Sequence, residues 1–163
     1  MIKVGILSDT HCHKPDPDFL AATQKCFADC EIIVHAGDLT DISVLEAFAP
    51  KTVYGVHGNM CSASSRRQLP AHRTFEIAGF TFGLAHGNGL GQDIENRLIS
   101  LFPEADCLVY GHTHRPVCKQ VGKIMIINPG TFRSSGRYGA PGTYAIVEVA
   151  DTLKANIYEV PTR

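Results

Sequence analysis

Short apolar runs that end in polar, metal-ligating residues recur along this 163-residue chain and constrain its fold more than any other feature. The clearest is residues 108–114, where an apolar run meets Gly111 and then His112 and His114. Such a run is typical of a strand buried on both faces. Ligands of open α/β sheets bind beyond the carboxyl ends of such strands. We therefore expect both imidazoles to stand at one strand end and face one site.

The same arrangement follows four other apolar runs. Residues 2–7 lead to Asp9 and His11, residues 31–34 to Asp38, residues 52–56 to Asn59, and residues 80–85 to His86. Any one of these residues alone could be a surface histidine or a helix cap. Their repetition at successive strand ends favours one shared site.

The segments between these runs predict helices and further strands. Proline, aspartate and apolar spacing predict one helix from about residue 17 to residue 29, a short one at 41–48 and an amphipathic one at 90–102, with a loop or short helix at 61–70. Residues 73–78 and 80–85 predict a hairpin, and 117–121, 123–128, 144–149 and 153–158 predict strands. Strands alternate with helices first and a β meander follows. This order favours an α/β fold of two packed sheets with helices outside, in one domain over residues 1–163.

Composition narrows the classes of function. The net charge is -1, from 15 basic and 16 acidic residues, which argues against a large nucleic-acid or membrane footprint. The start of the chain lacks a signal peptide pattern, and no stretch approaches the ~20 apolar residues of a membrane span. We expect a cytoplasmic protein whose 6 cysteines are free thiols.

The polar groups at the strand ends have the chemistry of a metal site. Neutral imidazoles and ionised carboxylates are the usual ligands of borderline divalent cations. The groups are too many for one tetrahedral ion, and they suit two ions that share a bridging carboxylate. Gathered without a cation, they would be costly through charge repulsion and desolvation.

These motifs resemble, in order, those of the calcineurin-like metallophosphoesterases. The match covers residues 4 to about 130, and the short length with Asn128-Pro129-Gly130 is similar to the small YfcE-type phosphodiesterases. The resemblance implies a four-layer α/β/β/α sandwich of two mixed sheets flanked by helices. The matching motifs are Asp9-x-His11, Gly37-Asp38, Gly58-Asn59, His86-Gly87 and Gly111-His-x-His114.

The resemblance also implies a role for each ligand. Asp9, His11 and His114 would hold one metal; Asn59, His86 and His112 would hold the other; and Asp38 would bridge them. Asp38, Asn59 and His86 would then support a metal-bridging hydroxide that attacks phosphorus. The metal implied is Mn²⁺, with Ni²⁺, Fe²⁺, Zn²⁺ or Mg²⁺ as alternatives.

The chain departs from the family pattern beside Asn59. Many relatives place a histidine next, where it can protonate the leaving group, but here the residue is Met60. His57, His13 and a water on Asn88 are weak candidates for that task. We therefore expect the fastest turnover for esters with acidic leaving groups, such as aryl phosphodiesters. Residues 130–142 predict a mobile loop, whose Arg133 and Arg137 either contact phosphate or are solvated.

The expected function is a divalent-metal-dependent phosphodiesterase acting on a phosphoester small molecule or nucleotide. Two alternatives stay open: a metal-binding interaction scaffold of the same fold with little catalysis, and a phosphomonoesterase or nucleotidase. The resemblance also leaves a homo-oligomer open, because the subgroup often self-associates.

Overall fold

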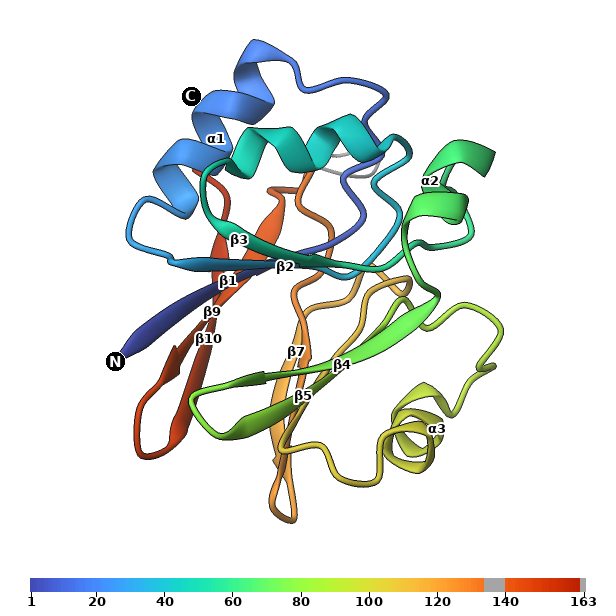
Figure 1. The fold of residues 1–163 in the computed structure, drawn as a ribbon, viewed down its shortest axis with the longest axis vertical. Coiled ribbons are helices and arrows are strands. Elements are labelled where there is room, and N and C mark those ends of the chain that lie inside the picture. The colour runs from blue at the N-terminus through green and yellow to red at the C-terminus, as the bar shows by residue number, and fades with distance from the viewer. Residues whose placement is uncertain (134–139, 162–163) are drawn as a thin grey trace.

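The computed structural model describes residues 1–133 and 140–161, and its strands form two sheets (Figure 1). The first sheet has the order β10-β9-β1-β2-β3, with β1 (Ile2–Leu7), β2 (Ile32–His35), β3 (Thr52–Gly55), β9 (Thr143–Val149) and β10 (Leu153–Glu159). The second has the order β4-β5-β6-β8-β7, with β4 (His72–Ile77), β5 (Phe80–Ala85), β6 (Cys107–Val109), β7 (Val117–Val121) and β8 (Ile124–Asn128).

Within the described residues, four helical segments accompany the sheets: α1 (Pro17–Cys26), the 3₁₀ helix η1 (Ile42–Phe48), α2 (Ala63–Gln68) and α3 (Ile94–Leu101). In Figure 1, α1 and η1 lie together over the first sheet, and α3 lies beside the second sheet. The Asp16 side chain caps α1 by accepting a hydrogen bond from the Phe19 N–H at 2.8 Å. The Asp41 side chain accepts one from the Ser43 N–H at 2.9 Å at the start of η1. No helix in the described part of the chain is long and apolar enough to cross a membrane.

Three clusters of buried side chains lie between the four layers of the fold, which are helices, the first sheet, the second sheet and α3. Between the sheets lie residues such as Val34 and Val109, whose side chains are fully buried. Leu7, Phe27 and Phe48 form a second cluster on the helix-covered face of the first sheet. Leu98 and Leu108 belong to a third cluster, between α3 and the second sheet. Because strand neighbours alternate between faces, each inner strand contributes to two clusters. This confirms the predicted layering of two mixed sheets between helices.

Strand register brings the predicted site residues to one edge. β1, β2 and β3 are parallel, with Leu7 opposite His35 and His35 opposite Gly55, so the three strands end together. β5 and β6 are also parallel, with Leu84 opposite Val109. The loops that follow all five strands therefore leave the sheets in a common direction.

Two helices are shorter than predicted. α3 begins at Ile94, not near residue 90, because Gly89 and Gly91 adopt positive φ angles of 79° and 68° that a helix does not tolerate. α1 ends at Cys26, about three residues early. Residues 61–70 contain the short helix α2. The loop predicted at 130–142 lies partly outside the described residues, as does Arg137.

Candidate metal centre

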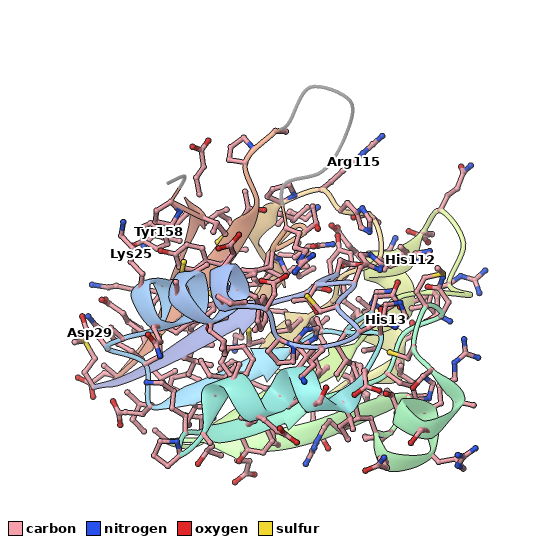
Figure 2. All side chains as sticks on the ribbon, turned by 90° about the horizontal axis from the view of Figure 1, so that it is seen from above. His13, Lys25, Asp29, His112, Arg115 and Tyr158 are labelled. Atoms are coloured by element: carbon pink, nitrogen blue, oxygen red, sulfur yellow. The ribbon has the colours of Figure 1, made fainter. Side chains whose placement is uncertain are left out.

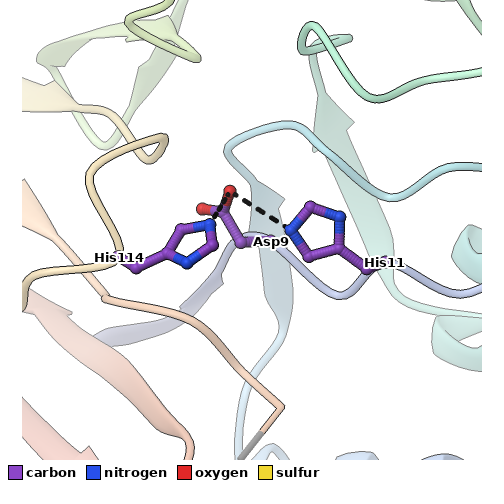
Figure 3. A group of neighbouring side chains, drawn as sticks. All are labelled: Asp9, His11 and His114. Carbon is purple, nitrogen blue, oxygen red and sulfur yellow. Dashed lines mark hydrogen bonds and ion pairs between the residues drawn. The ribbon is translucent and has the colours of Figure 1, made fainter. Parts of the chain in front are cut away.

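Asp9 is the centre of the candidate site. Its side chain is fully buried, and Oδ1 lies 3.1 Å from His114 Nε2, 3.8 Å from His11 Nε2 and 3.9 Å from His86 Nε2. Figure 3 shows the imidazoles of His11 and His114 approaching Asp9 from opposite sides. The two histidines come from loops that are more than 100 residues apart in the sequence but converge on one carboxylate oxygen.

The other oxygen of Asp9 is held by the protein. Ser8 Oγ donates a hydrogen bond to Asp9 Oδ2 at 2.6 Å, and the His112 backbone N–H donates another at 3.2 Å. Thr131 Oγ1 donates to the Asp9 backbone carbonyl at 3.0 Å. These bonds fix the carboxylate so that Oδ1 remains directed at the imidazoles, the kind of support that metal ligands need. Sequence reasoning missed Ser8 and Thr131, since a lone hydroxyl carries no recognisable signal.

A second group consists of Asp9, Asp38 and His86, all buried. His86 Nδ1 lies 2.7 Å from the Ala36 carbonyl, so Nδ1 carries the proton and donates it there. Nε2 then presents a lone pair, 3.1 Å from Asp38 Oδ2. Nε2 has no hydrogen-bond partner among the described residues. A lone pair facing two carboxylates in a buried place requires a cation, either a proton or a metal ion.

The pKa values of His86 and Asp38 are shifted in the directions that favour a positive charge between them. Burial alone would lower the pKa of His86, but the Asp38 and Asp9 carboxylates outweigh it and raise that pKa above 6.5. Burial raises the pKa of Asp38, whereas the His86 imidazole and the Met60 N–H, 2.7 Å from Asp38 Oδ1, lower it to a net value below 3.8. Both shifts favour a positive charge next to ionised Asp38.

The two groups share Asp9, whereas the resemblance makes Asp38 the bridge. The remaining predicted ligands, Asn59 and His112, are exposed, and His112 belongs to neither group of His and Asp side chains. The His112 ring packs edge-on against His86, with centroids 5.2 Å apart. The Asn59 backbone carbonyl accepts a hydrogen bond from the Arg66 guanidinium. The assignment of each ligand to a particular ion thus stays a prediction.

The backbone at the site is held in an unusual conformation. Five of the predicted ligands have positive φ angles: Asp9 (54°), His11 (46°), Asp38 (53°), His112 (66°) and His114 (58°). Such angles cost of order 1–3 kcal/mol each in residues other than glycine and cluster at functional sites. At Gly58 and Gly111, an added Cβ would collide with Asp38 Oδ1 and Ser8 Oγ, respectively. Close approach of the loops explains why glycine precedes Asn59 and His112.

The secondary candidates lie around this centre. His35 is buried and hydrogen-bonded, and His72 is exposed. His13 is exposed and lies toward the same end of the molecule as His112 (Figure 2). Arg133 forms an ion pair with Asp16 at 2.6 Å. The six cysteines are free, as expected.

The sequence and the fold match known proteins. Residues 2–152 match the calcineurin-like phosphoesterase superfamily domain. A probable metallophosphoesterase of Methanothermobacter thermautotrophicus is 37% identical over 133 aligned residues, and the alignment covers 78% of this chain and 76% of that protein. The phosphodiesterase YfcE of Escherichia coli K12 is 40% identical over 65 residues, 40% of this chain and 33% of that one. The structure of vacuolar protein sorting 29 from Cryptosporidium parvum aligns with a TM-score of 0.75 at 20% identity, covering 97% of this chain and 98% of that chain.

The family match extends from the first strand to the last turn, and it includes every loop that converges on Asp9 and Asp38. These buried Asp and His groups are consistent with metal sites. The chain therefore belongs to the calcineurin-like phosphoesterase superfamily, with homologues among its small archaeal and YfcE-type phosphodiesterases.

Proposed function

We propose that this chain is a divalent-metal-dependent phosphodiesterase. The observation that carries the proposal is the buried lone pair of His86 Nε2, directed at Asp38 and Asp9 without a hydrogen-bond partner in the described structure. A proton could satisfy this geometry at one position. The adjoining group of Asp9, His11 and His114 extends the same need for positive charge to a second position.

Asp9, His11 and His114 would hold one divalent ion. Asn59, His86 and His112 would hold the other, with Asp38 between them. When bound, such ions acidify a water that attacks phosphorus and neutralise the charge on its oxygens. Mn²⁺ is the proposed metal, on the strength of the family resemblance; the mixed nitrogen and oxygen ligands also accommodate Ni²⁺, Fe²⁺, Zn²⁺ or Mg²⁺.

The protein's own groups orient the ligands. The Ala36 carbonyl fixes the His86 tautomer, and Ser8 with the His112 N–H fixes Asp9. The Met60 N–H holds Asp38 Oδ1 at 2.7 Å. The Met60 side chain is 58% exposed and cannot transfer a proton. The departing oxygen would then take its proton from solvent, which favours esters of acidic alcohols such as nitrophenol.

The test is hydrolysis of bis(p-nitrophenyl) phosphate by protein stripped with chelator and then supplied with Mn²⁺. We expect turnover only after metal is added. Asp38→Asn keeps the shape of the side chain but removes its charge, and should lower kcat/KM about a hundredfold or more, because metal charge stabilisation is worth several kcal/mol. Asp151→Asn, at an exposed aspartate outside the site, is the matched control and should retain activity. Equal activity in Asp38→Asn and the control would contradict the proposal.

A second candidate function is an interaction scaffold, favoured by the close match of this fold to vacuolar protein sorting 29. Protein that binds metal yet hydrolyses neither diesters nor monoesters would support it. The ratio of p-nitrophenyl phosphate to bis(p-nitrophenyl) phosphate turnover would separate a monoesterase from a diesterase.

A further inference from the structure

The loop from Gly58 to Cys61 carries the predicted ligand Asn59 and connects β3 to α2. Hydrogen bonds of its backbone hold it in place. The Met60 N–H donates to Asp38 Oδ1 at 2.7 Å, and the Gly58 N–H donates to Cys61 Sγ at 3.3 Å. At position 60 the contact with the candidate metal centre is therefore made by the backbone N–H.

Arg66, on α2, binds this loop through two backbone carbonyls. Its Nη2 donates a hydrogen bond to the Asn59 carbonyl, and its Nε donates one to the Cys61 carbonyl at 3.2 Å. These two N–H groups are neighbours on one edge of the planar guanidinium, so one rigid group holds both carbonyls. Hydrogen bonds from a charged donor are also stronger than those between neutral groups.

A single peptide unit joins Arg66 to Asp38. The Asn59 carbonyl and the Met60 N–H belong to one planar, trans peptide, in which they point in opposite directions. Arg66 holds the carbonyl end of this peptide, and Asp38 Oδ1 accepts from its N–H end. A positive charge on the carbonyl polarises the peptide and strengthens the N–H as a donor. Arg66 can thus influence the orientation of Asp38 through the peptide between them.

The helix that carries Arg66 is itself attached to the segment that carries Asp38. Ser65 is fully buried, and its Oγ donates to the Thr40 carbonyl at 3.1 Å. The Ser62 N–H donates to the same carbonyl at 2.8 Å. Because Thr40 lies two residues after Asp38, these bonds keep α2 at a fixed place relative to that carboxylate.

We propose that Arg66 is a positioning residue of the candidate metal centre, which holds the Asn59–Met60 peptide and thereby orients both Asn59 and Asp38 as metal ligands. This role rests on the proposed metal-dependent function and deepens it. It also gives a physical reason why methionine is tolerated at position 60, since the backbone N–H of that residue makes the contact with Asp38.

The test is equilibrium titration of chelator-stripped protein with Mn²⁺, for the wild type, Arg66→Ala and Arg67→Ala. Arg66→Ala should weaken Mn²⁺ binding by about tenfold to a hundredfold, the usual effect of removing a group that orients a metal ligand. Arg67→Ala is the matched control and should keep the wild-type affinity. Both arginines are exposed in the last turn of α2, so the two variants lose the same charge at the same helix end. Equal affinities in the two variants would overturn the positioning role.

A second variant separates the paired hydrogen bonds from the positive charge. Arg66→Lys keeps the charge but lacks two neighbouring donors on a rigid plane, so it should also bind Mn²⁺ more weakly than the wild type. It carries the comparison if Arg66→Ala does not fold. Wild-type affinity in Arg66→Lys would overturn the proposed role of the guanidinium. A lower urea midpoint for Arg66→Ala with wild-type Mn²⁺ affinity would likewise show that Arg66 supports only the fold.

Hydrolysis of bis(p-nitrophenyl) phosphate separates positioning from direct contact with substrate. At limiting Mn²⁺, Arg66→Ala should lower kcat and keep the wild-type KM for the diester. A raised KM with wild-type Mn²⁺ affinity would overturn the positioning role and make Arg66 a substrate contact. Wild-type protein that binds Mn²⁺ but hydrolyses no diester contradicts the phosphodiesterase assignment alone, because the affinities still decide the role of Arg66. Wild-type protein that binds no Mn²⁺ contradicts both.

Discussion

A single carboxylate, Asp9, organises the candidate site at the scale of the residue. One of its oxygens is fixed by Ser8 and the His112 N–H, and the other faces the imidazoles of His11, His86 and His114. Because the hydrogen bonds to one oxygen hold the Asp9 carboxylate in a fixed orientation, the other oxygen stays directed at the imidazoles. Metal affinity should therefore depend on Ser8, although Ser8 itself is not a ligand.

Ser8→Ala should weaken Mn²⁺ binding by about ten- to a hundredfold, the usual effect of losing a partner that orients a metal ligand. It should also lower the free energy of unfolding by about 1–3 kcal/mol, because the buried Asp9 loses a hydrogen bond. Metal titration and urea denaturation measure the two effects. Ser100→Ala, which removes an exposed hydroxyl from α3, is the control. Unchanged metal affinity in Ser8→Ala would show that Asp9 needs no such support.

His35 makes the folded chain sensitive to acid. Its Nδ1 accepts a hydrogen bond from the Gly37 N–H at 3.2 Å, and its Nε2 lies 3.1 Å from Thr10 Oγ1. Burial, followed by the charge of nearby His86, lowers the pKa of His35 from 6.5 to about 3. Between these values the unfolded chain binds a proton that the folded chain does not. The contribution of neutral His35 to the free energy of unfolding is therefore fully present above pH 6.5. It is lost progressively as the pH falls from 6.5 towards the lowered pKa of about 3.

His35→Gln should flatten this pH dependence. Between pH 6.5 and 4.5, the wild-type free energy of unfolding should fall more steeply than that of the variant, by up to about 1.4 kcal/mol per pH unit. Urea denaturation in the presence of chelator measures the slopes. His72→Gln removes an exposed imidazole and should keep the wild-type slope. Equal slopes in His35→Gln and wild type would mean that His35 is protonated in the folded state.

At the scale of the element, the end of β8 holds the turn that carries His112 and His114. The fully buried Asn128 donates from Nδ2 to the Gly111 carbonyl at 2.8 Å and to Thr113 Oγ1 at 3.0 Å. Its Oδ1 accepts from the Gly130 N–H at 2.9 Å. Both Nδ2 bonds of Asn128 therefore fix a turn whose histidines have positive φ angles.

Asn128→Asp tests whether these hydrogen bonds hold the turn, because it preserves the shape of the side chain and removes the Nδ2 donor. The Gly111 carbonyl would then face a carboxylate oxygen, so we expect about 2–3 kcal/mol lower stability and at least tenfold weaker Mn²⁺ binding. Asn156→Asp, the same exchange at an exposed position of β10, should change neither. A lower free energy of unfolding with unchanged Mn²⁺ affinity would show that Asn128 stabilises the fold but does not support the metal ligands.

The sequence predicts the strands and ligand motifs well because both depend on local patterns. Apolar runs such as residues 2–7 and 80–85 became β1 and β5, and the polar residues beyond them converged. The predicted start of α3 near residue 90 was wrong. Gly89 and Gly91 prevent a helix there through their backbone conformation, and the spacing of apolar residues carries no information about that conformation. The support from Ser8 and Asn128 depends on contacts between distant segments, which no single-sequence pattern encodes.

At the scale of the whole molecule, the candidate site belongs to neither sheet alone. Asp9, His11 and Asp38 follow strands of the first sheet, whereas His86 and His114 follow strands of the second. The apolar cluster between the sheets, which includes Val34 and Val109, therefore sets the distance across the site. Metal binding and packing of the two sheets should be coupled, so saturating metal should stabilise the folded chain.

A metal count distinguishes the proposed pair of divalent ions at this edge of the two sheets from a single ion or none. Protein stripped with chelator is titrated with Mn²⁺, and bound metal per chain is measured at equilibrium for the wild type and His86→Ala. We expect two ions per wild-type chain and about one in His86→Ala, because the Asp9, His11 and His114 group stays complete. One ion or none in the wild type, or an unchanged count in His86→Ala, would contradict it.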